Sequence, residues 1–161
     1  LDMMRRAKIE VKTVGVTGEF VTGSHGVTVK ADLKPEEISF NNIDGVVLPG
    51  GMPGTVNLGK SETVTKAAVH CAENGKITAA ICAAPSVLGN LGILKGKKAT
   101  CFPGFEKELE GATYTAAPVE IDGNVITGKG AGCAILFGKA IVEKAVSAEA
   151  ANKVCGDMQC P

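Results

Sequence analysis

Apolar and polar positions alternate in the first part of the chain, as they do in half-buried strands. Residues 8–16, KIEVKTVGV, follow this two-residue period and predict a strand. Residues 18–32 carry the same kind of pattern on both sides of GSHG, at 23–26. Because glycine and serine favour turns, these residues predict a hairpin that turns at 23–26.

Two later segments are continuously apolar, which is the pattern of strands covered on both faces. They are residues 44–51, DGVVLPGG, and residues 76–82, KITAAIC. Between them, residues 61–75 space their small and apolar positions as a helix does, and Ser61 is suited to cap its start. A further short helix is expected to begin directly after Cys82.

The second half of the chain continues the alternation of strands and helices. KKATCF, at 97–102, predicts a strand, and EKELEG, at 106–111, predicts a short helix. Residues 115–130 predict two short strands joined at an Asp-Gly turn. Two helices are expected over 133–146 and 147–154, and Ser147 is suited to cap the second.

This order of elements predicts an α/β fold. Buried strands that alternate with helices form a three-layer α/β/α sandwich with a mostly parallel sheet, as in flavodoxin-like proteins. The 161 residues contain no linker, repeat or low-complexity tract, and a chain of this length can bury a core of its own. We therefore expect one domain over residues 1–161.

Composition and charge narrow the choice of partners. Lys and Arg number 17 and Asp and Glu 17, and no basic stretch gathers aromatic residues, so nucleic acid is not an expected partner. No apolar run reaches the ~18 residues of a membrane span, and the start does not resemble a signal peptide. We expect a cytoplasmic protein without a membrane partner.

The six cysteines are spread along the chain without CxxC spacing, so we expect reduced thiols rather than a disulfide framework. The only close pair, Cys155 and Cys160, has no histidine nearby in the sequence. We assign no metal site.

The sequence AAICAAPS places Cys82 where a buried strand is expected to turn into a helix. Reactive residues gather at the carboxyl ends of parallel strands, and the N–H groups at a helix start favour a thiolate. The small side chain of Ala83 leaves room for a sharp turn, like the elbow that exposes a nucleophile in hydrolases. We predict that Cys82 has a strained backbone and presents a thiolate to a pocket.

Gly50 and Gly51 end the neighbouring strand and are expected to face Cys82. Their backbone N–H groups, which carry no side chain, are suited to hold an oxyanion or a carboxylate beside the sulfur. Taken alone, Pro-Gly-Gly is more simply an ordinary tight turn, and the order of the two motifs on successive strands makes the assignment more specific. We interpret GKGAG, at 128–132, as a close backbone approach near this pocket.

The chain resembles the ThiJ/PfpI superfamily, which has the class I glutamine amidotransferase-like fold, and within it the branch of the Parkinsonism-associated protein deglycase. The resemblance rests on DGVVLPGGMPGTVNL, ITAAICAAPSVL, ITGKGAGCAILFGKAIVE and VTGSHGVTVKAD. It implies that Cys82 is a nucleophile that oxidises readily to a sulfinate. It also implies that Gly50, Gly51 and the amide of Ala83 are its backbone partners, and that the loop holding Gly130 and Cys133 lies close to the pocket.

Three departures from the family pattern accompany this resemblance. Members of this branch begin with a strand that ends in a glutamate, and this glutamate forms a hydrogen bond with the cysteine. In the present sequence this strand is absent before LDMMRRAKIEV. We expect the missing strand to lie between residues 8–16 and 44–49. Phe102 stands where some relatives have a histidine, so that side of the pocket should be apolar. Ala83 replaces the histidine that follows the cysteine in the peptidase branch.

The leading functional hypothesis is a cofactor-independent enzyme, a glyoxalase or protein deglycase, in which Cys82 adds to methylglyoxal or to its adducts on protein amines. The product would be a hydroxy acid. The alternative is a redox sensor or stress-response chaperone whose cysteine is oxidised. An intracellular cysteine peptidase is the least supported because of Ala83. By resemblance we also expect a homodimer.

Overall fold

Four strands form the central sheet. They are β3 (Gly45–Leu48), β4 (Ile77–Ile81), β7 (Val119–Asp122) and β8 (Val125–Gly128). In this computed structural model, which describes residues 1–160, the strands lie in the order β3-β4-β8-β7. β4 pairs in parallel with both β3 and β8, whereas β7 and β8 are antiparallel. The sheet is therefore mostly parallel, as the apolar runs predicted.

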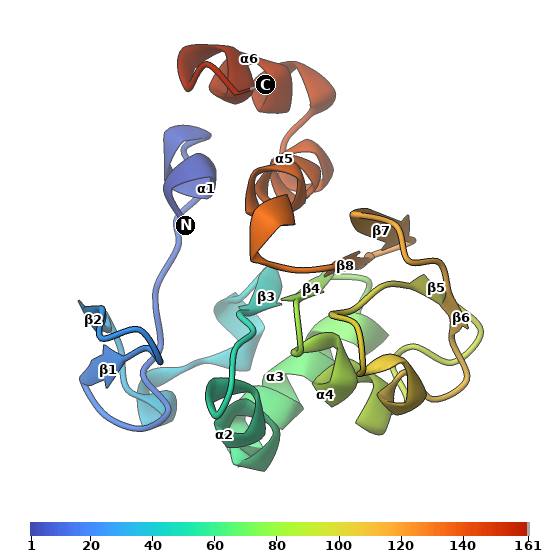
Figure 1. Cartoon of the computed structure of the whole chain (residues 1–161). Helices are drawn as coiled ribbons and strands as arrows, with labels where there is room; N and C mark the ends of the chain where they lie inside the picture. Colours follow the sequence, from blue (N-terminus) through green and yellow to red (C-terminus); the bar gives the residue numbers. More distant parts are fainter. Residues whose placement is uncertain (161) are drawn as a thin grey trace.

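Helices cover both faces of this sheet, which gives the predicted three layers. The helices are α1 (Asp2–Arg6), α2 (Gly54–Lys60), α3 (Glu62–Glu73), α4 (Pro85–Asn90), α5 (Ala134–Ala145) and α6 (Ala148–Asp157). Helices α1, α5 and α6 lie on one side, and α2, α3 and α4 lie on the other (Figure 1).

Each face of the sheet has its own apolar core, because successive side chains of a strand point to opposite faces. In β4, Ala79 packs in the core beside α5, and Ala80 packs in the core beside α3 and α4. Val125 and Ile126 of β8 divide in the same way. Small residues in the central strand let both helix layers approach the sheet closely.

Several predicted elements are confirmed. The Ser61 hydroxyl accepts from the N–H of Val64 and caps α3, and the Ser147 hydroxyl accepts from Ala150 and caps α6. The early hairpin consists of β1 (Phe20–Thr22) and β2 (Thr28–Lys30), paired antiparallel. The later hairpin, β7 and β8, turns at the predicted Asp-Gly pair.

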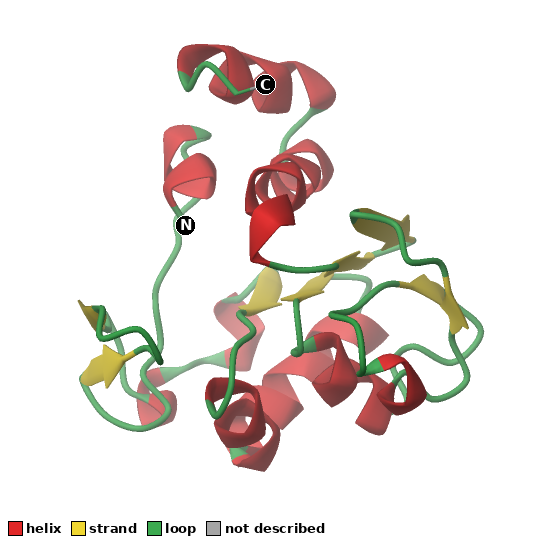
Figure 2. Ribbon diagram, in the orientation of Figure 1, coloured by secondary structure: helices red, strands yellow, loops and turns green. Residues whose placement is uncertain are grey.

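The strand predicted over residues 8–16 does not form. This segment is a loop between α1 and β1 (Figure 2), and within residues 1–160 its only sheet-like contact is a single bridge from Val14 to Leu33. Lys8, with φ of 65°, also interrupts an extended conformation. The alternation of side chains was predicted correctly, but a strand also needs a hydrogen-bonded neighbour along its length, and within residues 1–160 the backbone of residues 32–33 bonds only to residues 13–15.

Two further predictions were longer than the elements observed. Within 97–102 only β5 (Lys98–Ala99) forms, and it pairs with β6 (Thr113–Tyr114) outside the main sheet. The helix predicted at 106–111 is a single 3-10 turn, Glu106–Glu108. The other 3-10 turns are Pro35–Glu37, Phe40–Asn42 and Ala131–Cys133. Helix α2 was not predicted from the sequence pattern.

Strand β3 departs from the prediction of a strand buried on both faces. Val46 contacts one core and Val47 the other, yet both remain half-buried and Gly45 is exposed. The reason is that β3 is an edge strand: within residues 1–160 no strand pairs with its side away from β4.

Candidate active site

A sharp turn at the carboxyl end of β4 presents Cys82. The residue has φ of 66°, in the left-handed region that non-glycine residues rarely adopt, at a cost of about 1–3 kcal/mol. Two backbone hydrogen bonds fix the turn. The Cys82 N–H donates to the Gly128 carbonyl (2.8 Å), and the Phe102 N–H donates to the Cys82 carbonyl (2.8 Å). The strained elbow predicted from the sequence is therefore confirmed.

The helix after the elbow begins later than predicted. Residues 82–84 form a turn, and α4 starts at Pro85, which suits the first helical position because proline lacks an N–H. This helix has only six residues. The elbow is therefore not followed by a long helix whose N-terminus could favour a thiolate, as the sequence had suggested.

Gly50 lies directly against the elbow. A Cβ at this position would be 2.5 Å from the Cys82 Cβ, 2.6 Å from the Ile81 carbonyl oxygen and 3.1 Å from the Ala83 nitrogen. Only glycine permits this approach between the ends of β3 and β4. The structure thus brings together Gly50, Cys82 and Ala83, as the order of the motifs predicted.

Three backbone N–H groups around the elbow have no acceptor. Within residues 1–160, the N–H groups of Gly50, Gly51 and Ala83 make no hydrogen bond to the protein. Ala83 is only 2% exposed, so its unpaired donor is withdrawn from water, which is uncommon in folded proteins. Unpaired backbone donors of this kind can stabilise an oxyanion.

Two hydroxyl groups that the sequence analysis missed fix these loops. The Thr55 hydroxyl donates to the Gly51 carbonyl (2.9 Å), and the Ser86 hydroxyl donates to the Ala83 carbonyl (2.7 Å). Each comes from the helix that follows its loop, and both residues are buried. The signal was a Ser or Thr three or four residues after a turn, where local bonds to the backbone are common.

The predicted pocket residues lie on the loops around the elbow. Phe102 donates to the Cys82 carbonyl, and its ring is 3.5 Å from the position of a Cβ on Gly130. Phe102 is 47% exposed, so this side of the site is an open apolar surface. Cys133, half-buried, ends the turn that starts after Gly130 and is tied to it by an N–H to carbonyl bond (2.9 Å).

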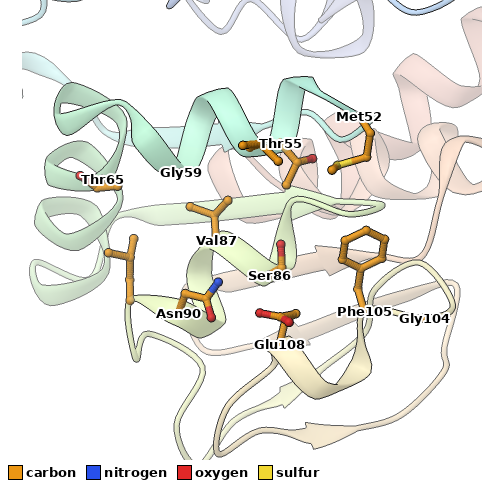
Figure 3. Close-up of a pocket in the computed structure, with 12 residues that line it drawn as sticks. Met52, Thr55, Gly59, Thr65, Ser86, Val87, Asn90, Gly104, Phe105 and Glu108 are labelled. Carbon is orange, nitrogen blue, oxygen red and sulfur yellow. The ribbon is translucent and has the colours of Figure 1, made fainter.

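A cavity of about 420 Å³ lies beside the elbow, on the side of α2 and α4 (Figure 3). Met52, Ser86 and Phe105 line it, and Asn90 and Glu108 supply its polar groups. Cys82 is not among the lining residues. The cavity is therefore lined by Met52, which follows Gly51, and by Ser86 of α4, and the Cys82 thiol does not open into it.

Two of the other thiols are poorly suited to reaction. Burial raises the pKa of Cys101 to about 11, and burial also raises the pKa of Cys71; both are completely buried. Cys82, by contrast, is half-buried. Because an accessible thiol reacts more readily than a buried one, the structure separates Cys82 from these two core cysteines.

The charge of the Glu106 carboxylate contributes to the raised pKa of Cys101, the residue before Phe102. Its two oxygens accept from the Gly104 N–H at 3.0 and 2.9 Å, and this bond lowers the pKa of Glu106. A general acid works best with a pKa near the working pH. Glu106 is therefore held as an anion and is poorly suited to that role.

Residues 1–160 contain no group of three or more His, Cys, Asp or Glu side chains arranged to hold a metal ion. No helix in the same part of the chain combines the length and the apolar character needed to cross a membrane.

An elbow cysteine at the carboxyl end of a parallel strand, opposite a glycine turn, defines the class: an α/β protein with a cysteine held at a strained turn. The sequence profile of the DJ-1/PfpI family matches residues 1–144, and the chain belongs to this family. The resemblance inferred from the motifs is confirmed.

Individual relatives agree with this assignment. The chain is 35% identical over 161 residues to the protein DJ-1 homolog B of Arabidopsis thaliana, covering 98% of this chain but only 37% of that protein. The crystal structure of Drosophila melanogaster DJ-1beta superimposes with a TM-score of 0.92 and 33% identity, covering 99% of this chain and 88% of that one. A protein named deglycase from Pyrococcus abyssi is 36% identical over 112 residues, which cover 68% of this chain and 66% of that protein.

Proposed function

We propose that this chain is a cysteine-dependent, cofactor-independent enzyme that acts on reactive carbonyls. The substrate would be a small α-oxoaldehyde such as methylglyoxal, or its early adduct on a protein amine. The observation that carries the proposal is the elbow: Cys82 in a left-handed conformation, half-buried, with Gly50 against it. The resemblance to deglycases supports the substrate class.

In this mechanism the sulfur of Cys82 attacks the aldehyde carbon, and the aldehyde oxygen becomes negatively charged as the C–S bond forms. The unpaired N–H groups of Gly50, Gly51 and Ala83 would hold that oxygen. A general acid/base would then move protons between carbon and oxygen, and water would release the hydroxy acid. Phe102 would cover the apolar end of the substrate.

The free side of β3 supports a proposal for the general acid/base. A strand that leaves one edge of a parallel sheet unpaired also leaves backbone N–H and C=O groups without partners. We propose that a further strand pairs with this edge and carries a glutamate close to Cys82, as the family resemblance implies. N-terminal sequencing of the native protein tests this; a native protein without such a strand would contradict it.

Homodimer formation is also proposed. Phe20, Val27 and Val29 of the β1–β2 hairpin are 63%, 68% and 51% exposed, which is unusual for apolar residues unless a partner covers them. Light scattering on the purified protein would give the molar mass. A monomer at all concentrations would contradict the proposal.

Turnover of methylglyoxal tests the central claim. We expect the intact protein to produce a hydroxy acid and the Cys82→Ser variant to lose activity by ~10³-fold or more, as when a nucleophile is removed. Cys155→Ser, on α6, is a matched control because it also removes one half-buried thiol. Equal activity of the Cys82 variant and the control would rule out the nucleophile.

Thiol reactivity separates this proposal from the redox alternative. With limiting iodoacetamide and peptide mapping, Cys82 should be labelled long before the buried Cys71 and Cys101. If Cys82 is instead slower than these core thiols, the elbow does not activate it. If Cys82 reacts first and is readily oxidised, yet the intact protein leaves methylglyoxal unchanged, the redox sensor becomes the better hypothesis.

A further inference from the structure

A second thiol site lies at the end of α6. The Cys160 N–H donates to the Cys155 carbonyl (2.9 Å), and the Gln159 N–H donates to the Gly156 carbonyl (3.1 Å). Gln159 has φ of 54°, in the left-handed region. This combination is a Schellman cap, in which one left-handed residue ends the helix and turns the chain back over its last turn.

A Schellman cap brings two particular side chains together, those of the residue after the left-handed one and of the residue at the start of the last turn. The contact is usually apolar. Here both positions are cysteines, Cys160 and Cys155, and both are half-buried, so that solvent reaches them. The cap therefore forms an accessible pair of neighbouring thiols.

The surrounding charges agree with this proximity. Partial burial raises the pKa of Cys160, and the charge of the Cys155 thiolate raises it further, because two adjacent anions repel. The ammonium group of Lys139, on α5, acts in the opposite direction. The ammonium group of Lys139 therefore lies close to the pair, and its charge favours the anionic form of Cys160.

We propose that Cys155 and Cys160 are a redox dithiol that closes to a disulfide when the protein meets a hydroperoxide. One thiolate attacks the O–O bond of hydrogen peroxide, which gives a sulfenic acid and, after protonation, water. The second thiol then attacks the sulfenic sulfur, the S–S bond forms, and a second water leaves. Two thiols lose two electrons, one peroxide gains them, and no other reactant is needed.

The site is separate from the elbow. Helix α5 lies between α6 and the sheet, so the pair is on the far side of that helix from β4 (Figure 1). The fully buried Cys71 and Cys101 are not accessible to compete with the pair. The dithiol can therefore be tested independently of any activity at Cys82.

The sequence around the pair makes the test direct. No Lys or Arg lies between residues 155 and 160, so trypsin, which cuts after Lys153, leaves both cysteines in one peptide. The protein would be treated with one equivalent of hydrogen peroxide in the Cys82→Ser background, alkylated, digested and analysed by mass spectrometry. We expect this peptide to lose two hydrogens and to escape alkylation, and dithiothreitol to restore both thiols.

The variants Cys155→Ser and Cys160→Ser should each abolish the internal link, leaving the other cysteine as a sulfenic or sulfinic acid. Oxidation of Met158 in the same peptide adds oxygen and is not reversed by dithiothreitol, so it is distinguishable. Recovery of both cysteines as free thiols, as two separate sulfinates, or as links between two chains would overturn the proposal.

Discussion

Residues 77–90 and residues 8–16 have equally regular apolar patterns in the sequence but adopt different structures. The first segment forms β4, the elbow and α4, with strands on both sides of β4. In the second, the N–H groups of Glu10, Val11 and Lys12 have no acceptor within residues 1–160. A pattern of side chains is therefore not sufficient for a strand, because the strand also depends on a partner elsewhere in the chain.

The alternation in residues 8–16 nevertheless has a structural meaning. Ile9 and Val11 pack against the core beside α5, whereas Glu10 and Lys12 are exposed. The pattern thus determines which side of the segment faces the protein. What it leaves undetermined is the backbone hydrogen bonding, and the two segments should differ most in properties that depend on it.

Amide hydrogen exchange should show the largest difference. The amides of Glu10, Val11 and Lys12 should exchange about 10³-fold or more faster than those of Ala79 and Ala80, which open only with the fold as a whole. Native-state exchange followed by NMR measures both. Protection at residues 10–12 comparable to that in β4 would mean that the segment is paired in solution.

Crowding at the elbow should give the next largest effect. Gly50→Ala places a methyl group 2.5 Å from the Cys82 Cβ and 2.6 Å from a backbone oxygen, so we expect a loss of about 1–3 kcal/mol in the free energy of unfolding. Carbonyl turnover should fall as well. Gly54→Ala is the matched control, because nothing lies within 4 Å of its Cβ. Denaturant unfolding of both variants is the measurement; equal stability would contradict the close approach.

Loss of the Ser86 hydroxyl should have a smaller effect. In Ser86→Ala the Ala83 carbonyl keeps the Ser86 N–H but loses the 2.7 Å hydroxyl bond, which contributes about 1 kcal/mol. We also expect turnover to fall modestly while the Cys82 thiol stays reactive. Ser39→Ala, at an exposed residue, serves as the control. If the Ser86→Ala variant is as stable and active as the control, the Ser86 hydroxyl does not stabilise the elbow.

The smallest effect is expected in the first segment, where Asp32 ties down residue 13. Its carboxylate accepts from the N–H and the hydroxyl of Thr13 at 2.8 and 2.9 Å and pairs with Arg5 at 3.1 Å. The Thr13 N–H above all, and then its hydroxyl, lower the pKa of Asp32. The ionised form is therefore favoured by folding, and its contribution is present above the ordinary carboxyl pKa and disappears as pH falls through the lowered one.

Asp32→Asn should accordingly lower the unfolding temperature slightly at about pH 7, and this difference should shrink in acid as the pH falls through the lowered pKa of Asp32. Thermal unfolding of the two proteins at these pH values is the measurement. A difference that persists unchanged in acid would show that the charge of Asp32 is not responsible.

The sequence was informative wherever local chemistry determines the structure. The Ser61 and Ser147 caps, the Asp-Gly turn and the small residues after Cys82 each act on their nearest neighbours, and the corresponding elements were predicted. By contrast, contacts between distant segments determine that residues 8–16 form a loop and that β3 lies at the edge of the sheet. Local rules apply to the start of α4 at Pro85 and to the hydroxyl bonds of Thr55 and Ser86. These features could not be predicted without knowing the geometry of the turns.

The four alanines at 79, 80, 83 and 84 are 0–2% exposed. In a library that samples every amino acid at these sites, selection for folded protein should therefore discriminate by volume more than by polarity. Glycine or serine would survive more often than valine or leucine, although the latter are more hydrophobic, because neither helix layer can retreat from the sheet. Phe102, which is 47% exposed, would tolerate a change of volume more readily than these alanines.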